Sequence, residues 1–392
     1  EAIFELGRTY AVKEDDENAF KCFNILIENV KDSSYVAKSY LEMGSLARNQ
    51  SMFNEALGYY KVVVEKMSDS EYADDALLAI ESIYQTKNDV KEYLAYLDAI
   101  GKGGSKSENE KESMIFNSAE QVFLSENYQK ALVALQSYVD EYPKGADLYK
   151  AEFYMAESYR ALERLEQACD CYANVIQYGE GSFVELSILN FANISYSLER
   201  WEEAYGGYSS LYSSALLENN TFVALTGMLR SAYRGRDWAN AIQKADMLME
   251  DQRSDEDLKV EAKYVKAKSY LATSRRDAAM EILNELAADP KTEYGAEAAY
   301  LLIVDCYDRG EFEEVENKVY AFADSGSEQT YWLAKGFVIL GDSFVERGEL
   351  KQARATFESV VEGYSPQRND DDVISSIEMR LTKLEEIENK DI

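Results

Sequence analysis

Few side chains in this sequence of 392 residues could carry out covalent or metal chemistry. The chain contains no histidine, so it cannot hold a Ser-His-Asp triad, a Cys-His pair, or a zinc or haem bound through histidine. Its four cysteines are Cys22, Cys169, Cys171 and Cys306. Cys169 and Cys171 lie about 200° apart around a predicted helix, so their thiols diverge and suit neither a disulfide nor a metal chelate. We expect small buried thiols, and no cofactor or metal site.

Two short motifs suggest ligands but lack the surroundings that those ligands require. Residues 101–104 match the Gly-x-x-Gly loop by which KH domains hold single-stranded nucleic acid, yet the run 105–110 that follows is polar and acidic rather than an apolar helix. We interpret it as a long flexible loop between repeats that could act as a hinge. Residues 370–372 with Glu378 lack the alternating ligands and central glycine of an EF-hand. We interpret them as an acidic N-cap of the last helix.

The charge balance excludes further classes of function. The chain has 73 acidic and 41 basic side chains, a net charge of −32, which disfavours binding to the phosphates of DNA or RNA. With so many carboxylates, no pair can be singled out as the acid and base of a glycosidase. The longest runs of Leu, Ile, Val and Phe, 301–304 and 337–340, are four residues long, far from the ~20 apolar residues of a membrane-spanning helix. We therefore predict a protein that is not an enzyme, binds no nucleic acid and has no transmembrane segment in this chain.

The elements that carry these side chains repeat about every 37 residues. A small residue is followed by an aromatic residue at +3, alanine at +12, and an aromatic residue or leucine at +16. The clearest copies begin at Gly7, Ala156 and Gly341; the copy at Gly44 has Ala47 at +3, and weaker copies begin at Ala119 and Ala267. The prolines lie 11 to 13 residues after the repeated +12 position, at the end of a unit: Pro143, Pro290 and Pro366. Aromatic residues lie three before the same position: Phe53, Tyr128, Trp201, Trp238 and Phe312.

This pattern predicts a helical hairpin in each unit. Both helices are amphipathic with a period of 3.6 residues. Small residues at the crossing let the two backbones approach, and the aromatic residues fill the groove beside it. Because one hairpin cannot bury both of its faces, the units must stack into a solenoid with a continuous core.

The small–aromatic–alanine–aromatic set, with an aromatic residue three before the alanine and proline at the end of the unit, resembles the tetratricopeptide repeat family. The resemblance implies an all-α, right-handed superhelical solenoid of antiparallel helix pairs, with about ten repeats in a single domain. The period exceeds the ~34 residues of the family, and units 71–100 and 293–326 lack the repeated alanine. The predicted units are 1–33, 34–70, 71–105, 106–145, 146–180, 181–215, 216–254, 255–291, 292–327 and 328–366, followed by a capping helix over 369–390.

The resemblance also implies a binding groove lined by the first helix of each unit. We therefore predict a scaffold that binds a protein or peptide segment, and the mixture of cations and rings would suit one with acidic or C-terminal carboxylate groups. The other interpretation is that these cations balance neighbouring carboxylates. No copy has the Lys–Asn–Lys–Arg clamp of the co-chaperone members. The predicted groove residues are Lys38, Arg48, Phe116, Phe123, Lys150, Phe153, Arg160, Tyr196, Arg230, Tyr233, Tyr264, Lys268 and Lys335.

Two other functions and the compartment stay open at this point. A glycan-handling envelope protein, either a helical sugar binder or an α/α-toroid enzyme, would need an aromatic platform, and Trp332 is the only tryptophan outside the repeated positions. A purely structural oligomerisation module would show matching apolar patches. The lengthened units resemble bacterial envelope proteins, which favours the envelope or periplasm, whereas four unpaired cysteines favour the cytoplasm. The uncapped first helix suggests a fragment of a longer repeat protein with an unknown oligomeric state.

Overall fold

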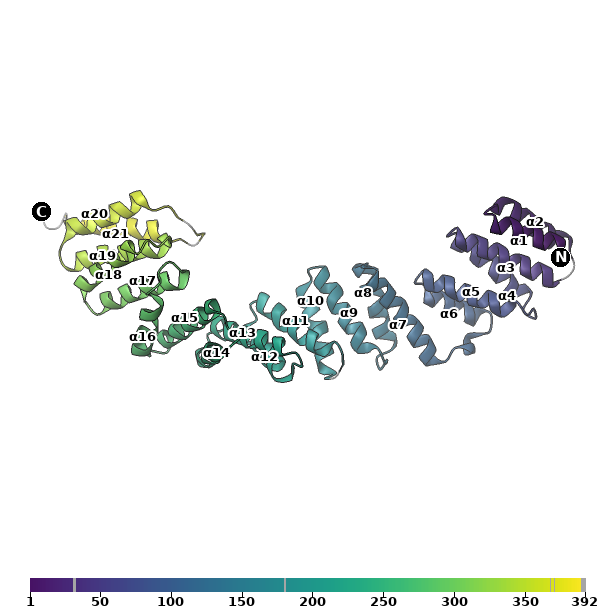
Figure 1. Ribbon diagram of the computed structural model, residues 1–392, viewed down its shortest axis with the longest axis horizontal. Helices are drawn as coiled ribbons and strands as arrows, with labels where there is room; N and C mark the ends of the chain where they lie inside the picture. Colours follow the sequence, from purple (N-terminus) through teal and green to yellow (C-terminus); the bar gives the residue numbers. More distant parts are fainter. Residues whose placement is uncertain (31–32, 180, 367, 370, 389–392) are drawn as a thin grey trace. The chain divides into compact units, whose positions relative to one another are not determined.

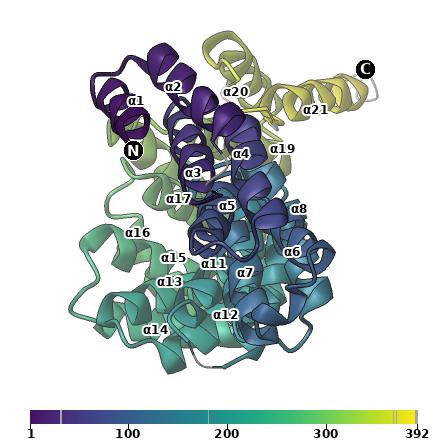
Figure 2. The same ribbon diagram turned by 90° about the vertical axis from the view of Figure 1, so that its right-hand side faces the viewer.

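The computed structural model describes residues 1–30, 33–179, 181–366, 368–369 and 371–388. Within these ranges the chain forms 21 α-helices and one 3₁₀-helix, with no β-strand (Figures 1 and 2). The helices belong to two compact units, residues 1–187 and 188–392. The prediction of an all-α fold is confirmed, and the prediction of a single domain stays a prediction.

Consecutive helices of the first unit pack as antiparallel hairpins. The hairpins are α1 (Ala2–Val12) with α2 (Asp16–Asn29), α3 (Ser33–Asn49) with α4 (Phe53–Lys66), α5 (Ala73–Thr86) with α6 (Val90–Ala99), α7 (Glu108–Leu124) with α8 (Tyr128–Glu141), and α9 (Leu148–Ala161) with α10 (Leu165–Gln177). The 3₁₀-helix, Gly103–Ser105, lies between α6 and α7. The segment that we interpreted as a flexible loop therefore contains a short helical turn.

The second unit continues the same arrangement. The elements are α11 (Val184–Ser197), which begins before the division between the units, with α12 (Trp201–Ser214), then α13 (Glu218–Arg234) with α14 (Trp238–Glu250), α15 (Glu256–Ala272) with α16 (Arg276–Leu286), α17 (Glu293–Asp308) with α18 (Phe312–Asp324), and α19 (Thr330–Glu346) with α20 (Leu350–Gly363). The last helix, α21 (Val373–Glu388), packs on α19 and α20. Ten hairpins and a final helix in the described residues agree with the predicted repeat count.

The final helix buries one apolar stripe, as a capping helix requires. Ile377 and Leu384 are buried, as is Val373, and Leu381 packs against the same core. The Asp371 carboxylate accepts a hydrogen bond from the backbone N–H of Val373 at 3.1 Å, as expected for an acidic residue at a helix N-terminus. Of the other residues in this prediction, 370 and 389–390 lie outside the described residues.

Each hairpin turns through one residue with a left-handed backbone conformation. This residue always lies two positions before the second helix, and its φ is between 54° and 75°. Only two of the ten are glycine, although the conformation costs other residues ~1–2 kcal/mol. The packing of the two helices therefore imposes the turn. The residues are Glu14, Ser51, Asn88, Glu126, Glu163, Glu199, Arg236, Ser274, Gly310 and Gly348.

The repeated small residues lie where the two helices of a hairpin cross, as predicted. A Cβ atom added at Gly341 would lie within 3.0 Å of the Phe357 ring, which is fully buried. In two copies leucine replaces the ring and alanine replaces glycine, as expected if the two side chains share one volume; the copy at Ala156 instead combines alanine with Tyr172. The glycine pairs are Gly7–Phe23, Gly44–Tyr60 and Gly341–Phe357, and the alanine pairs are Ala119–Leu135 and Ala267–Leu283, each 16 residues apart.

The four cysteines are free and buried, which confirms their prediction as packing residues. Burial raises the pKa of the Cys171 thiol to about 12, so the thiolate that would bind a metal or react is disfavoured. Among the described residues, no three side chains of Cys, Asp or Glu are grouped so that they could hold a metal ion. No described helix has the length and apolar character to cross a membrane.

Candidate interaction surface on the first helices

The predicted groove residues all lie on the first helix of a hairpin. We call this surface the first-helix face, defined by those thirteen residues. The first unit carries Lys38 and Arg48 on α3, Phe116 and Phe123 on α7, and Lys150, Phe153 and Arg160 on α9; the second carries Tyr196 on α11, Arg230 and Tyr233 on α13, Tyr264 and Lys268 on α15, and Lys335 on α19.

In the first unit, a cluster of rings joins α7 to α9. Phe123 stacks on Tyr154 with 4.5 Å between ring centroids, and Phe116 lies 6.4 Å from the same ring. Phe153 is buried and stacks on Phe183 at 4.2 Å. Phe116 is also buried, so these two rings hold neighbouring hairpins together, and Phe123 is the more accessible part of the cluster.

Tyr154 is at the centre of this cluster and was missed by the sequence prediction. Its hydroxyl donates to the Glu120 carboxylate at 2.7 Å, and burial raises the pKa of the phenol. Tyr154 is two residues before the small residue Ala156, one position away from the slots that the family resemblance indicates. The tyrosine at that position was the only signal that could have found it.

The cations of the first unit have partners close by. The Lys150 ammonium is 2.6 Å from the Asp147 carboxylate and lies over the Phe116 ring. Arg160 pairs with Glu157, one turn away on the same helix. Lys38 lies over the ring of Tyr72, which comes directly before α5, at 5.3 Å. Arg48 is exposed near the end of α3 and lies, with Lys38, two hairpins away from the α7–α9 cluster.

In the second unit, the predicted cations connect each hairpin to the next. Arg230 on α13 makes two hydrogen bonds to the Glu261 carboxylate on α15, of 2.8 and 2.7 Å. Lys268 on α15 lies 2.7 Å from Glu297 on α17. Lys335 lies 3.2 Å from both carboxylate oxygens of Asp372, directly before α21. The interpretation of these cations as partners of neighbouring carboxylates therefore holds.

One cleft on this face brings two predicted residues together. It has a volume of ≈ 310 Å³ and lies between α11, α12 and α13, with Tyr196 and Arg230 in its lining. The buried Tyr208 forms a wall, and its hydroxyl donates to Asn193 at 2.7 Å. A Cβ on Gly227 would lie within 3.0 Å of the Tyr208 ring. The wall thus depends on a glycine that the groove prediction did not include.

Beyond the cleft, tyrosine rings continue along the first helices of the second unit. Tyr233 on α13 lies 6.4 Å from Tyr264 on α15, which stacks on Tyr294 of α17 at 4.6 Å. The Lys268 ammonium lies over the Tyr264 ring. Tyr264 is buried, and burial raises its pKa. Tyr294 was not predicted, because its helix belongs to a unit that lacks the repeated alanine.

Trp332 does not form an exposed aromatic platform. Its ring packs against the core of the second unit, and its indole nitrogen is buried with no hydrogen-bond partner among the described residues. The Arg368 guanidinium covers the ring at 5.5 Å and pairs with Glu293 at 2.8 Å. The one feature that the glycan-handling alternative required is therefore a packed side chain.

Comparison with known families identifies the repeat. Residues 150–178, which span most of α9 and all of α10, match the model of the tetratricopeptide repeat. That model describes one hairpin, and the described residues contain ten. The α9–α10 hairpin is a tetratricopeptide repeat. No curated protein sequence matches the chain.

Three solved structures align with this chain only loosely. A tetratricopeptide repeat protein from Parabacteroides merdae is 15% identical over 68% of this chain and 96% of its own, with a TM-score of 0.34. Yeast Tom70 is 10% identical over 97% of this chain and 95% of its own, with a TM-score of 0.35. The P58(IPK) TPR domain is 13% identical over 97% and 98%, with a TM-score of 0.25. Scores this low carry no argument about function, and the assignment depends on the repeat match and the hairpins.

Proposed function

We propose that this chain is a non-enzymatic scaffold of the tetratricopeptide type, and that each unit binds an extended segment of a partner protein along its first-helix face. The tetratricopeptide fold is that of a protein–protein interaction scaffold. Its helices are held in place by packing between neighbouring hairpins, so the binding surface is organised before the partner arrives. Less ordering entropy is then lost on binding.

The cleft lined by Tyr196 and Arg230 is the observation that carries this proposal. It combines partly exposed rings with a guanidinium whose orientation is fixed by Glu261. Tyrosine and arginine dominate the binding energy of many protein interfaces, because they bury a large area and keep a polar group available. The other rings on this face, such as Tyr233, extend the same kind of surface.

The ion pairs bear on the chemistry of the segment. Because Arg230, Lys268 and Lys335 already have acidic partners, the face offers donors and acceptors side by side rather than a field of free positive charge. We therefore expect the rings to supply most of the affinity, through apolar side chains of the segment. The preference for an acidic segment stays a prediction.

Selection of peptides tests the proposal without knowledge of the natural partner. The whole chain is immobilised, peptides are selected from a random twelve-residue library, and affinities are measured by calorimetry. We expect Tyr196→Ala to weaken the selected peptides about tenfold or more, the loss that follows when ~1.4 kcal/mol of ring contact is removed.

Tyr212→Ala is the matched control. Tyr212 is on α12, the second helix of the same hairpin, and is 38% exposed. Its substitution therefore removes a tyrosine ring from the second helix and leaves the first-helix face unchanged. The Tyr212→Ala variant should bind the selected peptides as tightly as the unmodified chain. Peptides that bind both variants equally well would show that the first-helix face is not the binding surface.

A further inference from the structure

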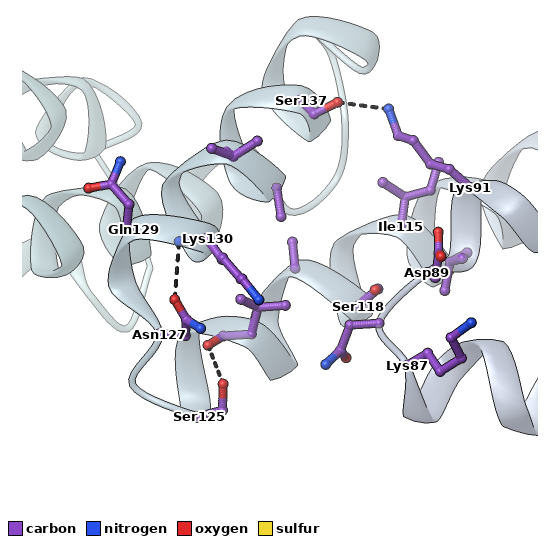
Figure 3. A pocket seen from close by; sticks show the side chains of 16 residues that line it. Lys87, Asp89, Lys91, Ile115, Ser118, Ser125, Asn127, Gln129, Lys130 and Ser137 are labelled. Carbon is purple, nitrogen blue, oxygen red and sulfur yellow. Dashed lines mark hydrogen bonds between the residues drawn. The ribbon is translucent and has the colours of Figure 1, made fainter. Parts of the chain in front are cut away.

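A second cavity in the first unit lies away from the predicted groove residues. It has a volume of ≈ 570 Å³ and lies between the start of α6 and the bodies of α7 and α8 (Figure 3). At ten residues, α6 is the shortest of the described α-helices. The chain then turns through Gly101, with a φ of 74°, and the 3₁₀-helix before α7 begins. The cavity thus opens at the joint where the repeat is least regular.

The inner part of this cavity is apolar. Val90, Ile115 and Ala119 are buried in the lining, and the side chains of Val122 and Ala134 complete it. Val133, at the edge, is 67% exposed. The volume is within the ~300–1,000 Å³ range of ligand pockets, and an apolar floor of this kind would take an aliphatic side chain.

The rim of the cavity carries a net positive charge, opposite in sign to that of the whole chain. Acidic residues outnumber basic ones 73 to 41 in the sequence, but the cavity is lined by three lysines and one aspartate: Lys87, Lys91, Lys130 and Asp89. Hydroxyl and amide groups supply the other polar atoms of the lining. We call this cavity the lysine pocket, defined by these three lysines and the apolar residues Val90, Ile115, Ala119 and Val133.

The three lysines differ in how far they are already engaged. Lys91 reaches across to Ser137 at 2.7 Å and to Glu141 at 2.6 Å. Lys87 makes a long contact of 3.4 Å with the Asn54 side chain. The Lys130 side chain extends toward the middle of the pocket (Figure 3), and its ammonium contacts no acceptor among the residues that the structure describes. Lys130 is therefore available to an incoming anion.

We propose that the lysine pocket binds a short acidic segment of a partner protein, with an aliphatic side chain on the apolar floor and flanking carboxylates at Lys130 and Lys87. An apolar floor beneath cations favours such a segment over nucleic acid, whose phosphates the net charge of −32 repels. The same charge opposes a second copy of the chain as the occupant. This site is separate from the first-helix face and does not rest on the function proposed for it.

The test uses a defined probe, the acetylated and amidated peptide Glu-Glu-Leu-Glu-Glu, and methyl-labelled whole chain observed by NMR. We expect the methyl signals of Ile115 and Val133 to shift on titration, and the binding to weaken as salt is added. Lys130→Glu replaces an attraction by a repulsion and should weaken binding about tenfold. Ser118→Phe, which fills the pocket without a change of charge, should also abolish the shifts.

Lys66→Glu is the matched control. Lys66 is exposed on α4 in the same unit, outside the pocket, so this variant changes the net charge equally and should bind the probe like the unmodified chain. The proposal is overturned if the probe does not bind, if Lys130→Glu and Lys66→Glu bind equally, or if the shifts fall on the first-helix face. Self-association that Lys130→Glu abolishes, without probe binding, would instead assign the pocket to a second copy. None of these outcomes bears on the separate test of the first-helix face, in which Tyr196→Ala is compared with the unmodified chain.

Discussion

Gly341→Ala tests whether close contact with the opposite ring is what requires glycine at the crossing of α19 and α20. The added Cβ would lie within 3.0 Å of the fully buried Phe357 ring. Overpacking of a core costs ~1–3 kcal/mol, whereas glycine to alanine inside a helix gains ~1 kcal/mol from helix propensity. The expected net effect is a loss of about 0–2 kcal/mol of unfolding free energy.

A matched glycine in the same unit isolates the packing contribution. Gly206 lies inside α12, and an added Cβ there meets nothing within 4 Å. Gly206→Ala should therefore stabilise the chain by ~1 kcal/mol. The difference between the two variants, about 1–3 kcal/mol, measures the clash alone, since the propensity gain is common to both.

The assay is urea unfolding of the whole chain, with hydrogen exchange used to assign the effect to α19 and α20, since repeat arrays need not unfold in one step. Gly341→Ala with Phe357→Leu should recover most of the loss, because alanine opposite leucine is the natural pair at Ala119 and Leu135. If Gly341→Ala stabilises the chain as much as Gly206→Ala, the steric explanation of this glycine is wrong.

Three further predictions follow from single positions. Glu163 has a φ of 58°, so Glu163→Gly should stabilise by about 0.5–1 kcal/mol in urea unfolding, whereas Glu166→Gly, inside helix α10, should destabilise. Burial raises the pKa of Glu152, so its contribution to stability is present below the ordinary pKa of about 4 and is lost as pH rises through the folded-state pKa. Glu152→Gln should therefore be more stable than the unmodified chain at pH 7, and the difference in unfolding free energy should close below pH ~4. Thiol titration should find no fast-reacting cysteine until the chain is unfolded, and rapid modification of the folded chain would contradict the burial of Cys22, Cys169, Cys171 and Cys306.

The repeat was predictable because its signal comes from positions where size is fixed by close packing. In the predicted unit 146–180, the two helices are observed as Leu148–Ala161 and Leu165–Gln177. Even the units that lack the repeated alanine form hairpins, because Tyr93 and Val315 are buried at that position. Packing within one hairpin depends on residues close in the sequence, so the sequence alone reveals it.

The site was less predictable because its partners come from neighbouring repeats. That Arg230 pairs with Glu261 depends on which carboxylate of the next hairpin faces it, and opposite charges roughly one repeat apart are too frequent in this chain to single it out. The positive φ of the turns left no compositional signal, since eight of the ten residues are not glycine. The lysine pocket depends on the join between α6 and α7, where the regular spacing that supported every other prediction is interrupted.

The most direct measurement of the proposed function is hydrogen–deuterium exchange of the whole chain with and without a peptide selected on it. Binding along the first-helix face predicts slower exchange in the first helices α11, α13 and α15, which carry Tyr196, Arg230 and Tyr264. The second helices α12, α14 and α16 should exchange as before. Slower exchange confined to the second helices, or no change in either set, would contradict the proposal that the first-helix face binds the partner.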